Sequence, residues 1–118
     1  MNLTKTLHAR SSDQCELCGD DHGLEPYCVP PKSSQDPDEN ILVCAECLDQ
    51  IEHPDMTDPD HWRCLNDSMW SDIPAVQVVC FRMLTRLSDE GWPQDLLDIL
   101  YLDDDVLAWA EQDQRKGN

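Results

Sequence analysis

Two identical cysteine pairs constrain this chain more than any other feature of its sequence. Each has the spacing Cys-x-x-Cys, and the four residues are Cys15, Cys18, Cys44 and Cys47. A pair with this spacing turns the backbone so that both thiolates face one ion, and two such pairs complete a tetrahedron. No secretion signal is recognised ahead of the first pair, which favours zinc over disulfides. The sequence therefore predicts one structural zinc ion held by these four thiolates.

The residues around the pairs predict a small zinc-ribbon or treble-clef-like module over residues 1–55. Residues 24–29 and 41–43 are strand-like and form a short β-hairpin in this interpretation, with 33–40 as a solvated loop between them. Helical spacing follows the second pair, so Cys47 should lie in the first turn of a helix, where the positive helix end stabilises a thiolate. Because the module holds little apolar material, zinc should supply much of its folding free energy.

The rest of the chain, residues 56–118, predicts a helical segment of two to three helices packed on the module. An apolar stripe over residues 76–87 has the spacing of one buried helix face. A second helix can start at Pro93, and a third, shorter one can cover residues 106–110. Another short helical pattern, over residues 3–10, precedes the first cysteine pair. The predicted fold class is therefore α+β.

Acidic residues dominate the charge of the chain. It has 118 residues, 25 Asp and Glu against 8 Lys and Arg, and a formal net charge of -17. This balance argues against general nucleic-acid binding and against anionic membrane surfaces, because both need a basic face. No apolar run is long enough to span a bilayer. A soluble, cytoplasmic protein with no nucleic-acid partner is expected.

Other residue types that bind metals occur outside the two pairs. They are Cys28, Cys64, Cys80, His8, His22, His53 and His61. His61 and Cys64 form a His-x-x-Cys unit that could begin a second metal site or supply a substitute ligand, although no second pair completes it. Cys80 lies on the apolar helix stripe and is expected in the core. The remaining histidines lack a partner at fixed spacing and are expected on the surface.

Four tryptophans stand out in a chain with a single Phe. Trp92 is expected in the core, since burial of its ring removes a large apolar area from water. Trp62 and Trp70 are expected at the junction where the helices pack onto the zinc module. The alternative is that these two form an exposed platform for a partner peptide.

Several segments of this sequence resemble the PhnA family. They are Cys15–Gly19, Val43–Cys47, the tryptophan-rich block His61–Ser71 and Pro74–Val78. The resemblance implies an N-terminal zinc-ribbon-like module, a helical segment and, in longer members, a C-terminal PhnA domain of β type. Because the sequence ends in the polar tail of residues 111–118, that C-terminal domain is not expected here. The family is associated with alkylphosphonate-utilisation gene clusters, and no settled chemical activity comes with it.

The cysteine knuckles also resemble those of HNH nucleases. Arg10 and the four paired cysteines match that pattern. The strand over residues 25–29 has no histidine at the place where the general base would stand, so no catalytic residue is assigned and likeness of fold is only an analogy.

Three functions remain open from the sequence. The favoured one is a PhnA-like zinc-binding protein whose structural zinc module acts in binding or protein interaction. The alternative is a metal-dependent hydrolase of phosphonate or phosphodiester substrates with a degenerate HNH-like fold. A redox-active dithiol is the third. Whether the protein is an enzyme is left open.

Overall fold

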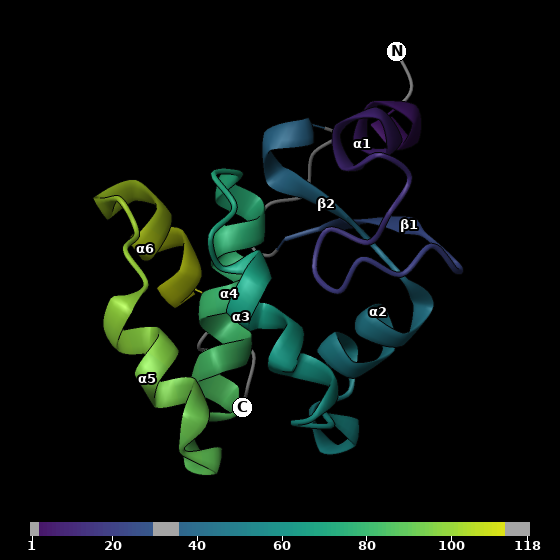
Figure 1. The fold of residues 1–118 in the computed structure, drawn as a ribbon. Coiled ribbons are helices and arrows are strands. Elements are labelled where there is room, and N and C mark those ends of the chain that lie inside the picture. The colour runs from purple at the N-terminus through teal and green to yellow at the C-terminus, as the bar shows by residue number, and fades with distance from the viewer. Residues whose placement is uncertain (1–2, 30–35, 113–118) are drawn as a thin grey trace.

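The computed structural model describes residues 3–29 and 36–112 and has an α+β fold. Its strands are β1 (Glu25–Cys28) and β2 (Asn40–Val43). Its α-helices are α1 (Leu3–Ser11), α2 (Ala45–Glu52), α3 (Leu65–Ser68), α4 (Pro74–Arg86), α5 (Trp92–Ile99) and α6 (Asp104–Gln112). In Figure 1, α4 lies near the middle, with α1, the strands and α2 on one side and α5 and α6 on the other.

The two strands form an antiparallel pair. Its register places Glu25 opposite Val43 and Cys28 opposite Asn40. All four residues of β2 are buried, because α1 and α4 both pack near this strand. β1 is more open, and its first residue is exposed. The hairpin predicted from residues 24–29 and 41–43 is therefore present, with β2 one residue longer than expected.

Helix α4 supplies more of the buried apolar core than any other helix or strand of the described residues. Pro74 occupies its first turn, where the missing amide hydrogen costs nothing. Seven of its residues are buried, namely Ala75, Val76, Val78, Val79, Cys80, Met83 and Leu84. The helix packs against α3, α5, α6 and β2. One apolar cluster thus contains residues of both the hairpin region and the helical segment, and the predicted core position of Cys80 is confirmed.

A buried polar contact joins α2 to the helical segment. Gln50 of α2 is only 7% exposed, and its Oε1 accepts hydrogen bonds of 2.8 Å from Trp62 Nε1 and from the backbone amide of Asp58. Its backbone carbonyl accepts a bond of 3.0 Å from Arg86 of α4. Because unsatisfied buried polar groups are costly, these bonds fix the position of α2 against the residues that follow it. The junction role expected for Trp62 is confirmed.

A second connection runs from the last helix to the hairpin. Trp109 is buried, and its Nε1 donates to the backbone carbonyl of Val29 at 3.3 Å. Arg82 of α4 donates to the carbonyls of Trp109 and Ala110 at 2.6 and 3.0 Å. Basic side chains near the last carbonyls of a helix stabilise its end. Helix α6 is therefore tied both to the central helix and to the end of β1.

The prediction of two to three helices after residue 55 was too low, since α3 to α6 all lie there. The missed segment is a 3₁₀ turn over residues 61–64 that continues into α3. It is too short for a helical stripe to show in the sequence. Burial of Trp62 and Leu65 stabilises it instead.

The expected junction role of Trp70 was wrong, since this side chain is 65% exposed. It follows α3 at the start of the connection to α4, where no other element covers it enough to bury it. Trp92 is half-buried against the core, and the guanidinium of Arg63 lies 5.0 Å from its ring centre. The prediction for Trp92 was therefore correct only in part.

Two sequence expectations lie partly outside the described residues. In the predicted loop over residues 33–40, residues 33–35 are not described, Pro37–Glu39 form a 3₁₀ turn and the buried Asn40 begins β2. In the polar tail, residues 113–118 are not described. No helix in the described ranges is long and apolar enough to cross a membrane.

Replacing Trp62 by Ala should destabilise the protein by about 3–5 kcal/mol, because it empties a fully buried site and removes one of the two donors to Gln50 Oε1. Trp70→Ala is the matched control and should change the free energy of unfolding by about 0.5 kcal/mol or less. Denaturant unfolding of both variants measures this. Equal losses in the two would contradict the burial described above.

Candidate metal centre

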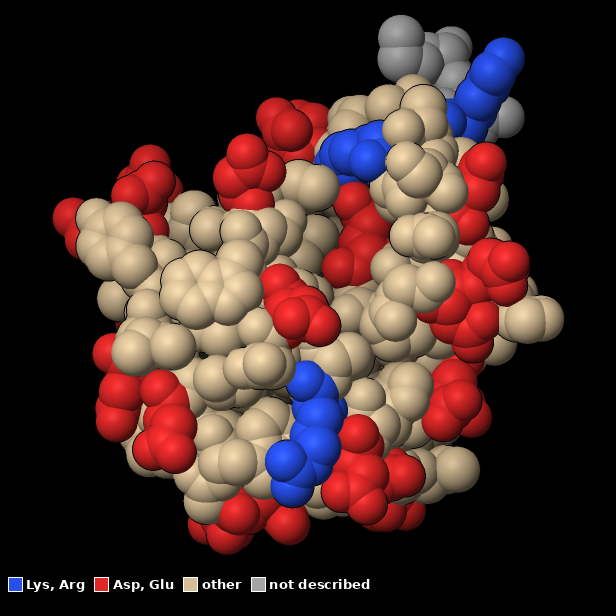
Figure 2. Space-filling model, viewed as in Figure 1, with Lys and Arg blue, Asp and Glu red and all other residues tan. Residues whose placement is uncertain are grey.

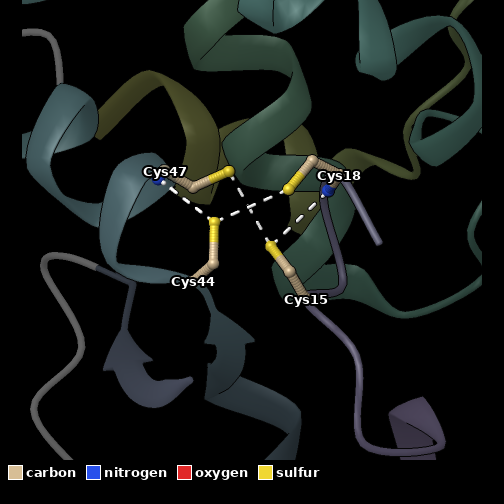
Figure 3. Close-up of side chains that lie close together, drawn as sticks. All are labelled: Cys15, Cys18, Cys44 and Cys47. Carbon is tan, nitrogen blue, oxygen red and sulfur yellow. Dashed lines mark hydrogen bonds between the residues drawn. The ribbon is translucent and has the colours of Figure 1, made fainter. Parts of the chain in front are cut away.

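Four sulfurs from distant parts of the chain converge at one point (Figure 3). The Sγ atoms of Cys15 and Cys47 are 3.7 Å apart, and those of Cys18 and Cys44 are 3.6 Å apart. All four lie within 4.8 Å of one another. A zinc tetrahedron with Zn–S bonds of about 2.3 Å has sulfur–sulfur edges of about 3.8 Å. The spacing of the sulfurs therefore fits a four-coordinate ion of this size, and all seven cysteines of the chain are free of disulfides.

The first knuckle is formed by a tight turn between α1 and β1. The amides of Leu17 and Cys18 approach Sγ of Cys15 at 3.4 and 3.5 Å, and the amide of Gly19 donates to the Cys15 carbonyl at 3.0 Å. Gly19 has a φ of +84°, a conformation that side-chain-bearing residues rarely adopt. The backbone of this turn thus directs amide hydrogens at the sulfur, as metal-binding knuckles do.

The second knuckle lies where β2 passes into α2. Cys44 is the N-cap of α2, and its Sγ accepts from the amide of Cys47 at 3.4 Å. Cys47 follows in the first helical turn, as the sequence predicted. The positive end of the helix there favours a negatively charged sulfur. Strand, cap and helix therefore place both sulfurs on the side that faces the first knuckle.

A buried ion pair holds the first knuckle against the rest of the module. Arg10 of α1 binds both carboxylate oxygens of Glu16, at 2.7 and 2.8 Å, and the Glu16 side chain is 4% exposed. Arg10 also donates to the carbonyls of Pro37 and Asn40. Glu16 in turn accepts from the amide of Leu42 in β2 at 2.7 Å. Glu16, which directly follows Cys15, is thereby fixed to both α1 and β2.

The thiols of the cluster influence one another strongly. Hydrogen bonding with Cys47 lowers the pKa of Cys15 to about 5, and the same contact raises the pKa of Cys47. Burial raises the pKa of Cys18 to about 12. Four thiolates this close repel one another unless a cation lies between them. A divalent cation at the centre would remove this repulsion and deprotonate the thiols on binding.

His61 lies against the four-cysteine group and contacts Cys47. The sequence had suggested His61 only as a partner of Cys64. The Nε2 atom of His61 is 3.2 Å from Sγ of Cys47, and the Nδ1 atom is 3.4 Å from a carboxylate oxygen of Glu46. A cysteine, histidine and carboxylate in this order also occur in enzymes with a cysteine nucleophile. Here the Cys47 residue is 0% exposed, so no substrate can reach its sulfur. The His61–Cys64 unit, which the sequence offered only as an incomplete second site or a substitute ligand, is not among the candidate metal groups of the described residues.

The other candidate ligands are not members of the four-cysteine group. Cys64 is half-buried, and burial together with the nearby thiols of Cys15 and Cys44 raises its pKa to about 12. Cys28 is half-buried in β1. A second cluster of possible ligands is formed by Asp20, Asp21 and His22, and all three are exposed. The His22 ring forms a 2.8 Å hydrogen bond with Asp20, which raises the pKa of His22.

The remaining histidines bind carboxylates near them in the sequence. His8 contacts Asp13 at 2.9 Å and is half-buried, and the exposed His53 contacts Asp49 at 3.5 Å. Both therefore lie at or near the surface, as expected.

Replacing Glu16 by Ala should cost about 3–5 kcal/mol, because it leaves the Arg10 charge without its buried partner. Glu16→Gln should cost less, since an amide oxygen can still accept from the Leu42 amide. The exposed Glu25 is the matched control, and Glu25→Ala should change stability by about 0.5 kcal/mol or less. Denaturant unfolding of the metal-loaded protein measures all three, and a loss below about 1 kcal/mol for Glu16→Ala would contradict this role.

Comparisons with known proteins identify no relative of this chain. No family model matches the chain, and neither a curated protein nor a solved structure matches it. The resemblance to the PhnA family therefore depends only on the motif residues that suggested it, and what is known of the centre comes from its own geometry.

Proposed function

We propose that this chain is a zinc-binding module in which Cys15, Cys18, Cys44 and Cys47 hold one structural ion. The observation that carries the proposal is the convergence of four sulfurs at the spacing of a zinc tetrahedron. Zinc is preferred over calcium or magnesium because a set of four thiolates suits a softer ion. When bound, the ion supplies a cross-link between the two knuckles and takes no part in a reaction.

A structural role is favoured over hydrolysis. A hydrolytic zinc ion needs an open position for water or substrate, whereas four thiolates fill its tetrahedron. Three of the four cysteines are also buried. Among the described residues, the other group of possible ligands consists of exposed residues. The hydrolase alternative therefore has no supporting arrangement in this part of the chain.

The distribution of charge supports a binding function with a basic protein partner. The four described arginines have contacts within the molecule: Arg10 with Glu16, Arg63 with Trp92, and Arg82 and Arg86 with backbone carbonyls. Among the charged side chains on the face shown in Figure 2, acidic ones predominate and basic ones are confined to a few places. The surface potential should thus be negative, which attracts basic partners and repels nucleic acid.

Exposed apolar residues add to this proposal. Trp70, Ile99 and Tyr101 are 65%, 55% and 78% exposed. Large aromatic side chains contribute strongly to protein interfaces when a partner covers them.

The same proposal includes the division of the chain into a module over residues 1–55 and a helical segment over 56–118. It also includes the PhnA-like character of both parts. They are supported by the cysteine pairs and by the motif residues.

Replacing Cys44 by Ser should abolish stoichiometric zinc binding and unfold the region around the hairpin, because three remaining thiolates leave the site incomplete. Cys28→Ser is the matched control, since Cys28 is half-buried outside the four-sulfur group, and it should keep one zinc per chain. Elemental analysis of the purified variants, with circular dichroism, measures this. Full zinc content in Cys44→Ser would refute the assignment.

The zinc-loaded protein should capture basic proteins from cytosol at an ionic strength of about 0.15 M and release them at about 1 M, where charge is screened within about 3 Å. Trp70→Ala should reduce capture without reducing stability. Duplex DNA should bind no more tightly than about 10⁻⁶ M, the tighter limit of ordinary non-specific association. Capture that is insensitive to salt, or tight DNA binding, would contradict the proposed partner class.

A further inference from the structure

We propose that His61 is an outer-sphere hydrogen-bond donor to the metal centre: its Nε2–H binds Sγ of Cys47 and sets how tightly the ion is held. The inference rests on the proposed four-thiolate site. It assigns to His61 a role other than the ligand role considered from the sequence, and it identifies a side chain outside the coordination sphere that controls zinc retention.

The contact has the geometry of a hydrogen bond to sulfur. Nε2 of His61 is 3.2 Å from Sγ of Cys47, and the His61 side chain is 15% exposed. The four sulfurs form the candidate coordination group, and His61 is not a member of it. To be a ligand, His61 would have to direct a nitrogen lone pair at the ion. Its Nε2 instead faces Sγ of Cys47, which is itself one of the four candidate ligands. His61 is therefore placed to donate to the ligand.

The ring of His61 is held from two further directions. It packs edge-on against Trp62, with ring centres 5.2 Å apart and an angle of 88° between the planes. Trp62 is itself fixed by its bond to Gln50. On the other edge of the ring, Nδ1 lies 3.4 Å from Glu46 Oε2, which is also 3.4 Å from Gln50 Nε2. The ring is thus held with Nε2 toward Sγ of Cys47 and Nδ1 toward Glu46, and turning it away from Cys47 would break both contacts.

A donor at this place has a direct effect on the bound ion. A zinc ion with four thiolates carries a net charge of -2 in a chain whose formal charge is already -17. A hydrogen bond from an N–H group to one thiolate stabilises the negative charge of that thiolate and protects it from protons and electrophiles. Cys15 and Cys44 receive backbone amides, which a side-chain substitution other than proline leaves in place. Cys47 receives a side chain, so a single substitution tests this contribution.

The first test measures zinc affinity by competition with a chromogenic chelator. His61→Ala should weaken zinc binding by about 10- to 100-fold, the usual effect of losing an outer-sphere partner. His61→Gln should lose less, because an amide N–H can still donate to the sulfur. His53→Ala is the matched control, since His53 is exposed and bonds to Asp49, and its affinity should be unchanged. Equal affinity in the wild type and His61→Ala would overturn the proposal.

The second test observes the hydrogen bond itself and separates it from a purely structural effect on folding. In wild-type protein loaded with ¹¹³Cd, the Nε2 proton of His61 should show scalar coupling to the metal through Sγ of Cys47, and the ¹¹³Cd shift should be that of four sulfur ligands. A four-sulfur shift without this coupling would overturn the role of His61 and leave the proposed function intact. Direct ¹⁵N–¹¹³Cd coupling would overturn it as well, since His61 would then be a ligand. A chain that does not bind cadmium through four sulfurs would refute the metal assignment and, with it, the inference.

Discussion

Mutual repulsion among four sulfur atoms is the constraint on which the rest of this structure depends. The sequence brings them together from two turns that are separated by residues 19–43, and their spacing matches the edges of a zinc tetrahedron. Such a cluster holds four thiolates only around a cation. The features around it all serve to fix the two turns: the capped start of α2, the amides directed at Cys15, and the buried bonds of Arg10 to Glu16.

The centre is also connected to the helical segment through a continuous set of contacts. Cys47 contacts His61, the ring of His61 packs on Trp62, and Trp62 bonds to Gln50 of the same helix that carries Cys47. Arg86 of the central helix bonds to the backbone of Gln50. The four-cysteine group and the packing of α4 are thereby linked by polar contacts as well as by the shared apolar core. The two cysteine knuckles therefore belong to the same folded unit as the helices that follow them.

The sequence predicted the elements whose signal is local. The spacing of the cysteine pairs identified the group that the structure brings together, and the apolar stripe identified the buried face of α4. The β-hairpin and the place of Cys47 in the first turn of α2 were also correct. Each of these depends on a short repeat or on residue types next to one another, which a single sequence displays directly.

The features that the sequence did not predict depend on contacts between distant residues. The helical turns over residues 61–68 are stabilised by burial and have no periodic pattern. Trp62 and Trp70 belong to one block, yet one is fully buried and the other is 65% exposed, and only tertiary packing decides between them. The position of His61 beside Cys47 likewise depends on the fold. In the sequence, the spacing of His61 and Cys64 suggested that these two residues would act together, and nothing pointed to Cys47.

X-ray absorption at the zinc edge of the purified protein tests the central claim most directly. The account predicts one zinc ion per chain with four sulfur neighbours at about 2.3 Å and no nitrogen or oxygen in the first shell. It also predicts that this spectrum stays the same in His61→Ala, since His61 lies outside the coordination sphere. A first shell that contains nitrogen or oxygen, or a folded protein that holds no zinc, would contradict it.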